Sequence, residues 1–239
     1  MKKVVFITGG SRGIGACAVE KFISCGYEVA FTYLKSEEDA LLLSERTGAL
    51  AIKADCSDSV QVSKAIAYAL ETYGKIDVLI NNVGISEFAL FTDISDEMWQ
   101  RMINTNLSSA FFASRAVLPQ MISRKSGCII NISSMWGEVG ASCEVHYSAS
   151  KAGLIGLTKA LAKEVAPSGI RVNCITPGAI DTDMNASLSN EDLEAIKDET
   201  PLGRLGTVSD IANALAFLAD EGASFITGQI LGVNGGYVI

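Results

Sequence analysis

The stretch VVFITGGSRGIG, residues 4–15, decides the fold of this 239-residue chain. Its apolar run predicts a buried strand, and the pattern that follows predicts a helix. A glycine-rich turn between them aims backbone amides at an anion from the helix N-terminus, which favours the diphosphate of a dinucleotide. The cofactor-binding residues that we expect in this turn are Gly9, Ser11, Arg12, Gly13, Ile14 and Gly15.

Three glycines of this turn have different expected tasks. Gly9 permits the tight bend, Gly13 lets the backbone approach a phosphate, and Gly15 lets the helix pack closely on the sheet. Many α/β proteins use such a turn without binding a nucleotide, so the motif alone also fits a purely structural turn.

Strand and helix patterns alternate along the whole chain. Apolar runs that predict strands buried on both faces lie at 4–8, 29–33, 49–54, 78–81, 127–132, 171–176 and 229–233. Patterns that predict helices lie at 14–24, 37–47, 58–73, 96–124, 147–165 and 208–219. The alternation predicts one α/β domain over residues 1–239: a Rossmann-type, doubly wound, mainly parallel seven-stranded sheet with helices on both faces.

Composition limits the partners and the compartment. Hydrophobic residues make up 49% of the chain, which is enough for one large core. The apolar run at the N-terminus is too short for a secretory signal, and no stretch is long enough to span a bilayer. The formal net charge of −8 disfavours nucleic acid and anionic membranes as partners. We expect a soluble, cytoplasmic protein.

Cysteine and histidine usage disfavours a metal site. The six cysteines form no CxxC pair, and His146 is the single histidine. A site built from several imidazoles is therefore excluded, and a thiolate site has no supporting spacing. We expect reduced, mostly buried thiols.

The choice of cofactor depends on the end of the second predicted strand. An NAD site would have a carboxylate there for the ribose 2′-hydroxyl, but the segment FTYLKS that ends this strand has none. Arg12, Lys35 and Ser36 instead offer two cations and a hydroxyl to a 2′-phosphate, which favours NADP(H). The alternative is that both cations are ordinary solvated charges and Glu37 or Glu38 binds the ribose.

A tyrosine, a lysine and a serine predict a proton-transfer site. Tyr147 and Lys151 are four residues apart, so on a helix they share a face. An ammonium about 5 Å from the phenol, at an effective dielectric near 20, would stabilise the phenolate by roughly 3 kcal/mol and so lower the tyrosine pKa. Ser134 ends a predicted strand, where its hydroxyl can reach the same point. The alternative is a surface pair in which the lysine stem covers the ring.

Several motifs, in order and spacing, resemble the short-chain dehydrogenase/reductase family nearly end to end. They are TGGSRGIG from Thr8, NNVG from Asn81, NTNL from Asn104, ISS from Ile132, YSASK from Tyr147, PG at Pro177 and VNGG from Val233. Within this family, KAGL from Lys151, GIRVN from Gly169 and FITG from Phe225 most resemble the 3-oxoacyl-[acyl-carrier-protein] reductases. One departure is Val83, where the family usually has alanine.

The resemblance implies a catalytic set of four residues. Tyr147 would donate the proton, and Lys151 would lower the pKa of Tyr147 and hold the nicotinamide ribose. Ser134 would orient the carbonyl, and Asn106 would anchor a water relay. The implied activity is reduction of a carbonyl to an alcohol with hydride from NADPH.

The resemblance also implies cofactor contacts beyond the glycine turn. Besides Tyr147 and Lys151, these are Asp55 and Cys56 at the adenine, Asn82 and Gly84 at its ribose, and Pro177, Gly178, Ile180 and Thr182 at the carboxamide and diphosphate. Three of them have structural alternatives: Asp55 as a helix cap, Asn82 as the closure of a turn, and Thr182 as a loop hydroxyl.

The sequence is compatible with several classes of substrate. The polar segment 179–206 at a strand end suits a substrate lid. A small molecule or an acyl thioester fits the site, and Arg124 and Lys125 are candidates for docking an acyl carrier protein. Ser168, where carrier-protein reductases often have a basic residue, disfavours that partner. A free ketone, a polyol or a sterol stays open as the substrate.

Residues around the predicted site and two long helices suggest further roles. Glu138 and Glu144 would discourage an anionic substrate or recognise a polar one, and His146 suits a wall or interface rather than proton transfer. Apolar faces on the helices at 96–124 and 147–165 predict a homotetramer, which the resemblance also implies. A non-catalytic regulator that senses NADP is the alternative of another class.

Overall fold

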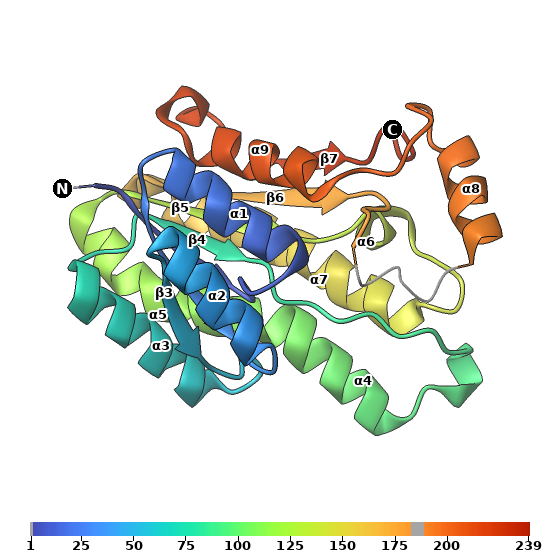
Figure 1. Ribbon diagram of the computed structural model, residues 1–239, viewed down its shortest axis with the longest axis horizontal. Helices are drawn as coiled ribbons and strands as arrows, with labels where there is room; N and C mark the ends of the chain where they lie inside the picture. The colour runs from blue at the N-terminus through green and yellow to red at the C-terminus, as the bar shows by residue number, and fades with distance from the viewer. Residues whose placement is uncertain (1, 183–188) are drawn as a thin grey trace.

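A computed structural model describes residues 2–182 and 189–239, apart from the side chain of Asn190. Seven strands form one sheet, and every neighbouring pair is parallel (Figure 1). They are β1 (Val4–Thr8), β2 (Glu28–Tyr33), β3 (Leu50–Lys53), β4 (Val78–Asn81), β5 (Gly127–Ile132), β6 (Ile170–Pro177) and β7 (Ile230–Val233). The predicted doubly wound sheet is confirmed, and it is entirely parallel rather than mainly so.

The strand order locates the site. The order β3-β2-β1-β4-β5-β6-β7 reverses direction between β1 and β4, where Thr8 pairs with Asn81. Ligands of doubly wound sheets bind beyond the carboxyl ends of the strands at such a switch point. The glycine-rich turn that follows β1 therefore lies at the ligand-binding edge of the sheet.

Helices cover both faces of the sheet (Figure 1). One face packs against α1 (Gly13–Ser24), α2 (Glu37–Thr47) and α9 (Val208–Ala219), and the other against α3 (Ser59–Tyr73), α5 (Ser109–Arg124) and α7 (Val145–Val165). Central strand residues such as Val5, Phe6 and Ile7 are fully buried because both faces are covered. Burying one such side chain contributes about 2 kcal/mol, so the sheet is a firm base for the loops at its edge.

Shorter elements lie at the carboxyl edge or join the layers. They are η1 (Phe91–Asp93), α4 (Asp96–Ile103), α6 (Trp136–Val139), η3 (Ala166–Ser168), α8 (Asn190–Glu199) and η5 (Glu221–Ala223). Among the residues that the structure describes, no helix is long and apolar enough to cross a membrane.

The helix predicted at 96–124 is present over these residues, but it is not α-helical throughout. The structure has α4, then a π-helical turn η2 (Asn104–Ser108), and then α5. A π turn takes one extra residue without breaking the run of apolar positions, so hydrophobic periodicity does not reveal it. The turn carries Asn106, whose buried amide finds its partners in another loop.

Candidate active site

Four predicted catalytic residues come together at the carboxyl ends of β4 and β5. Ser134 lies just past β5, Tyr147 and Lys151 are on α7, and Asn106 is in the π turn. All four are buried: Ser134 and Tyr147 are 7% exposed, Lys151 3% and Asn106 1%. The Lys151 ammonium nitrogen lies 5.7 Å from the centre of the Tyr147 ring, so the i, i+4 spacing does put the two side chains on one face of α7.

Asn106 ties the π turn to the loop after β4. Its Oδ1 accepts from the amide of Ile85 at 2.8 Å, and its Nδ2 donates to the carbonyl of the same residue at 2.9 Å. Nδ2 also lies 3.1 Å from the hydroxyl of Ser150, which in turn donates to the carbonyl of Tyr147. Asn106 therefore links the loop to α7, the helix that carries Tyr147, and no local pattern predicts Ser150 as its partner.

Lys151 is held from both ends. Its Nζ donates to the carbonyl of Ile132 at 3.0 Å, and its own carbonyl accepts from the hydroxyl of Ser133 at 2.8 Å. A Cβ on Gly84 would come within 3.1 Å of Nζ, so the glycine lets the loop after β4 pass over the ammonium. An ammonium has three N–H donors, and the bond to Ile132 uses one of them.

Burial controls the ionisation of both groups. It raises the pKa of Tyr147 to about 12, while the hydroxyl of Ser134 acts in the opposite direction and the charge of Glu144 adds to the rise. Burial also lowers the pKa of Lys151 to about 8. The expectation that Lys151 makes Tyr147 more acidic is therefore not met in the protein alone, because desolvation of the phenolate is the largest cause of the shift in its pKa.

The glycine turn is braced by its neighbours. The amides of Gly9 and Gly10 donate to the hydroxyl and the carbonyl of Thr32, at 3.0 and 2.9 Å. The Nδ2 of Asn82 donates to the carbonyl of Gly9 at 2.8 Å and to that of Thr8 at 3.0 Å. Asn82 thus closes the turn, as its structural alternative proposed; its predicted contact with a ribose stays a prediction.

Close approach explains two positions of the turn. Gly9 has φ +68°, a backbone conformation that side chains disfavour. A Cβ on Gly15 would lie 2.1 Å from the carbonyl oxygen of Gly9, so no larger residue fits where α1 meets the turn. Thr182 approaches the turn from the other side: its Cγ2 lies 3.8 Å from where a Cβ of Gly13 would be.

The first turn of α1 has no side-chain cap. Its N-cap residue, Arg12, makes no side-chain capping bond, and no acidic residue follows in the first turn. By contrast, Asp58 caps α3 and Ser95 caps α4. Uncapped amides together with the helix dipole suit an anion such as a diphosphate. Ser11 and Ile14 belong to this same turn and are partly exposed.

The predicted 2′-phosphate residues lie at the end of β2. Lys35 is exposed, and Ser36 is the N-cap residue of α2 without a side-chain cap. Glu37 is engaged elsewhere, because it pairs with Lys53 at 2.7 Å and accepts from the hydroxyl of Tyr33 at 3.4 Å. Glu37 is therefore a weaker candidate for the ribose than the sequence allowed.

The predicted adenine contacts have structural partners of their own. Asp55 accepts from the amide and the hydroxyl of Ser57, at 2.8 and 2.7 Å, so it shapes a turn rather than capping α3, which Asp58 does. Cys56 is buried, its Sγ lies 3.3 Å from the hydroxyl of Thr32, and burial raises its thiol pKa to about 11.

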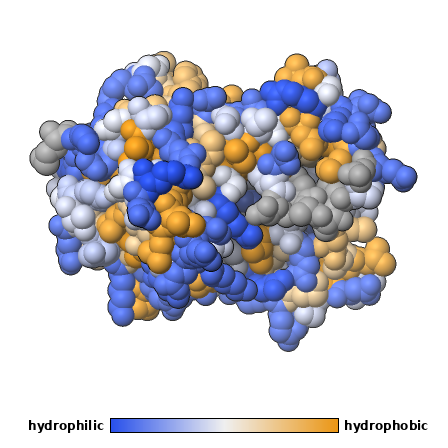
Figure 2. Space-filling view, in the orientation of Figure 1, coloured by the Kyte–Doolittle hydropathy of each residue, from blue (hydrophilic) through white to orange (hydrophobic). Residues whose placement is uncertain are grey.

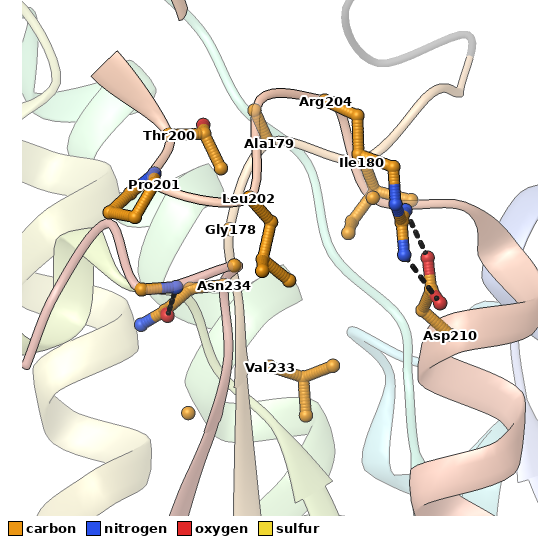
Figure 3. Close-up of a pocket in the computed structure, with 14 residues that line it drawn as sticks. Gly178, Ala179, Ile180, Thr200, Pro201, Leu202, Arg204, Asp210, Val233 and Asn234 are labelled. Atoms are coloured by element: carbon orange, nitrogen blue, oxygen red, sulfur yellow. Dashed lines mark hydrogen bonds and ion pairs between the residues drawn. The ribbon is translucent and has the colours of Figure 1, made fainter. Parts of the chain in front are cut away.

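The segment after β6 lines a cavity of about 470 Å³ (Figure 3). Gly178 and Ile180 contribute to it, with the α8–α9 connection and the end of β7 as the other walls. Figure 3 shows Leu202 and Val233 turned toward its middle. None of the four catalytic side chains lines this cavity, so it adjoins the site rather than containing it.

The turn after β6 is itself pinned. Pro177 accepts from the amide of Met135, next to Ser134, at 3.0 Å, and the amide of Gly178 donates to Val233 at 3.1 Å. Within the predicted lid, α8 is present, whereas residues 183–188 lie outside the described part of the chain. The lid function of 179–206 stays a prediction.

Two further features bear on the site. His146 is fully buried, and neither ring nitrogen has a hydrogen-bond partner in the structure, which fits packing rather than proton transfer. Within residues 2–182 and 189–239, no group of three His, Cys, Asp or Glu side chains could hold a metal ion.

Comparisons with known proteins agree with this geometry. The family model described as Enoyl-(Acyl carrier protein) reductase matches residues 9–238. A 3-oxoacyl-[acyl-carrier-protein] reductase FabG of Chlamydia trachomatis is 45% identical over 99% of this chain and 97% of its own length. FabG of Escherichia coli is 41% identical over 98% of this chain and 96% of its own, and the uncharacterized oxidoreductase YmfI of Bacillus subtilis is 42% identical over 99% of both.

The chain therefore belongs to the short-chain dehydrogenase/reductase family of nicotinamide-dependent oxidoreductases. Within this family, it is similar over nearly its full length to proteins named 3-oxoacyl-[acyl-carrier-protein] reductase.

Proposed function

We propose that this chain is an NADPH-dependent 3-oxoacyl-[acyl-carrier-protein] reductase of fatty acid synthesis. The observation that carries the proposal is the buried cluster of Ser134, Tyr147 and Lys151 beside the uncapped turn of α1. The similarity to the FabG proteins of Chlamydia trachomatis and Escherichia coli supports the choice of substrate.

The residues present fit a dinucleotide. The amides at the start of α1 would take the diphosphate, and the two further donors of Lys151 would take hydroxyls of the nicotinamide ribose. Arg12 and Lys35, which carry positive charge near the ends of β1 and β2, favour NADPH over NADH, and the engagement of Glu37 with Lys53 supports this choice.

The bound cofactor would supply a hydride to the carbonyl carbon. Ser134 donates a hydrogen bond to the carbonyl oxygen and so fixes the carbonyl in place. As negative charge develops on that oxygen, Tyr147 transfers its phenolic proton to it, and the product is the alcohol. Because burial raises the pKa of Tyr147 to about 12, the phenol stays protonated at neutral pH, as a proton donor for reduction must. Lys151 stabilises the phenolate that remains, and Asn106 anchors the path that returns the proton.

The surface beside the cluster favours an apolar acyl chain. Phe88, Leu90 and Phe91, before α4, are 58–69% exposed, and Val145 at the start of α7 is 37% exposed. Figure 2 shows orange surface on the right, below the centre, over the region where Figure 1 draws η1 and the start of α7. An alkyl chain leaving the reacting carbonyl would find apolar partners there.

The predicted docking residues for a carrier protein lie elsewhere. Arg124 pairs with Asp77, and Asp77 also accepts from the amide of Val4 at 2.8 Å. Val4 starts β1, so Arg124 is at the amino edge of the sheet, opposite the catalytic cluster. We therefore assign Arg124 a structural role, and we propose that an acyl carrier protein docks on other residues.

We also propose a cytoplasmic homotetramer that uses the outer faces of α5 and α7. Phe111 is 44% exposed beneath the guanidinium of Arg115, 4.8 Å from the ring centre, and Ile122 is 46% exposed. Leu154 on α7 is 1% exposed and belongs to the core, so it is not part of this outer face. Sedimentation of the purified protein would give the number of subunits.

The test is oxidation of NADPH by the purified protein with a 3-oxoacyl thioester, followed by the absorbance of the reduced nicotinamide. We expect turnover with the 3-oxoacyl thioester, a preference for NADPH over NADH of roughly tenfold or more, and none with a 2-enoyl thioester. Turnover of the enoyl thioester alone, or of small ketones but not thioesters, would contradict the substrate. Binding of NADPH without turnover of any carbonyl would favour the regulator.

A further inference from the structure

The proposed mechanism leaves one buried carboxylate unused. Glu144 is 6% exposed and stands at the N-cap position of α7, yet its side chain does not cap that helix. Its Oε1 instead accepts a hydrogen bond of 2.5 Å from the hydroxyl of Ser86, a residue 58 positions away in sequence. Burying a carboxylate is costly unless its position has a use, because the charge gives up its hydration.

The structure holds Glu144 beside the catalytic cluster. Asn106 binds both backbone groups of Ile85, the residue before Ser86. Three residues after Ser86, the amide of Ala89 donates to the carbonyl of Cys143 at 2.9 Å. The loop that carries Ser86 is therefore fixed on both sides, and the bond from Ser86 holds the Glu144 carboxylate against this loop.

The negative charge of Glu144 acts electrostatically at Tyr147, the proposed proton donor. Glu144 immediately precedes α7, three residues before Tyr147, and its charge acts on the phenol. The same charge helps to raise the pKa of Tyr147, after burial as the main cause. A second negative charge near the phenol would meet the field of Glu144 in a setting where little water screens it.

We propose that Glu144 selects neutral substrates: it admits 3-oxoacyl thioesters and esters and rejects the corresponding free 3-oxo acids. The inference rests on the proposed function, and it assigns a cause to the choice between two substrates that share one reacting ketone. In a free 3-oxo acid the carboxylate is two bonds from the ketone carbon, so it has to enter the site together with the carbonyl. Like charges brought together at a binding site reject the wrong partner without adding affinity for the right one.

The experiment compares kcat/KM for acetoacetate with that for its N-acetylcysteamine thioester and its ethyl ester, with NADPH at about pH 7.5. Burial raises the pKa of Glu144, so the assay is run at a pH well above the usual carboxyl range. Glu144→Gln removes the charge and keeps an oxygen that can accept from Ser86. We expect the ratio of free acid to neutral substrate to rise at least about tenfold, as for the loss of a like-charge contact. Glu144→Asp keeps the charge, so its ratio should stay closer to that of the wild type.

Glu138→Gln is the matched control. It removes the same charge from an exposed position on α6, so the ratio should stay within about twofold of the wild type because water screens that charge. An unchanged ratio in Glu144→Gln, or an equal rise in Glu138→Gln, would overturn the proposal. If Glu144→Gln does not fold, Ser86→Ala should raise the same ratio by a smaller factor, because the carboxylate keeps its charge but loses the hydrogen bond that fixes its position.

The two proposals fail in different ways. A wild-type protein without activity on the thioester contradicts the proposed function, whatever Glu144 does. The comparison of acetoacetate with the ethyl ester still tests Glu144 in that case, because both are free ketones that differ in one charge. If neither compound is turned over, the affinity of each for the complex of protein and NADPH can be measured from the fluorescence of the bound NADPH. The ratio of the two affinities then replaces the ratio of kcat/KM.

Discussion

The helices α1 and α9 pack side by side, but their N-termini differ in what their backbone amides contact. At α1, Arg12 provides no side-chain cap and no acidic residue follows. At α9, Thr207 and Asp210 form a reciprocal capping box, and Arg204 holds Asp210 with bonds of 2.8 and 3.1 Å. The pKa of Asp210 is held well below its usual range, chiefly by Arg204.

The segments around the starts of α1 and α9 differ in the same way. The ligand-facing edge consists of the glycine turn and the cluster of Ser134, Tyr147 and Lys151. The self-capped connection, between α8 and α9, satisfies its polar groups within the protein. The difference teaches that a helix start without a side-chain cap, as at α1, suits an anionic ligand, whereas a capping box such as that of α9 uses similar backbone amides for stability. Substitutions on the two sides should therefore have different consequences.

The largest effect is expected from Tyr147→Phe. Loss of the phenolic proton should lower kcat by about 10²–10⁴-fold, the usual contribution of a positioned acid. The melting midpoint should change little, because the ring stays buried. Tyr68→Phe, at a half-exposed position on α3, is the matched control and should keep full activity. Equal kcat in both variants would remove Tyr147 from the mechanism.

Gly15→Ala should act on the cofactor. The new Cβ would lie 2.1 Å from the carbonyl oxygen of Gly9 and 2.7 Å from Nδ2 of Asn82, so the turn has to shift. At a cost of about 1–3 kcal/mol, NADPH binding should weaken roughly 10–100-fold, as measured by quenching of protein fluorescence. Gly156→Ala, which meets no atom within 4 Å on α7, should leave affinity unchanged and add about 0.5–1 kcal/mol of stability. Equal affinities in the two variants would contradict close packing at the turn.

Lys151 should make the free energy of unfolding and the affinity for NADPH depend on pH. Its pKa is lowered to about 8, against 10.5 for an unperturbed lysine, so the folded protein releases this proton before the unfolded chain does. Between these pH values the unfolded state binds more protons, and stability from this group rises with pH. The difference in unfolding free energy between wild type and Lys151→Met, from urea titrations, should therefore shift in favour of the wild type as pH rises from about 8 to 10.5. NADPH affinity should fall several-fold over the same range, since the ammonium loses a charged donor. A difference that does not vary with pH would show that Lys151 titrates normally.

The smallest effect is expected on the self-capped connection. Thr207→Ala removes the cap of α9 and should cost about 1 kcal/mol of stability in urea unfolding. Its kcat and KM should match those of the wild type, because the amides at this helix start are not offered to a ligand. A kinetic defect as large as that of Gly15→Ala would end the distinction between the two helix starts.

The sequence by itself determined the fold class and the order of the strands and helices along the chain. Alternating apolar runs and amphipathic stretches predicted all seven strands, and their positions differ from the structure by a few residues at most. The glycine turn and the spacing of Tyr147 and Lys151 were readable for the same reason, since they depend on neighbours within about one helical turn or one strand end.

Only the tertiary structure decided which polar groups contact one another. The π turn that carries Asn106, the bond of Ser86 to Glu144 and the engagement of Glu37 by Lys53 join segments that lie up to 58 residues apart. The tertiary structure also reversed the expected direction of the pKa shift of Tyr147. The pKa is raised and not lowered, because the folded chain removes water from the phenol. Local pattern fixes where an element forms, whereas burial and long-range contacts fix what its side chains can do.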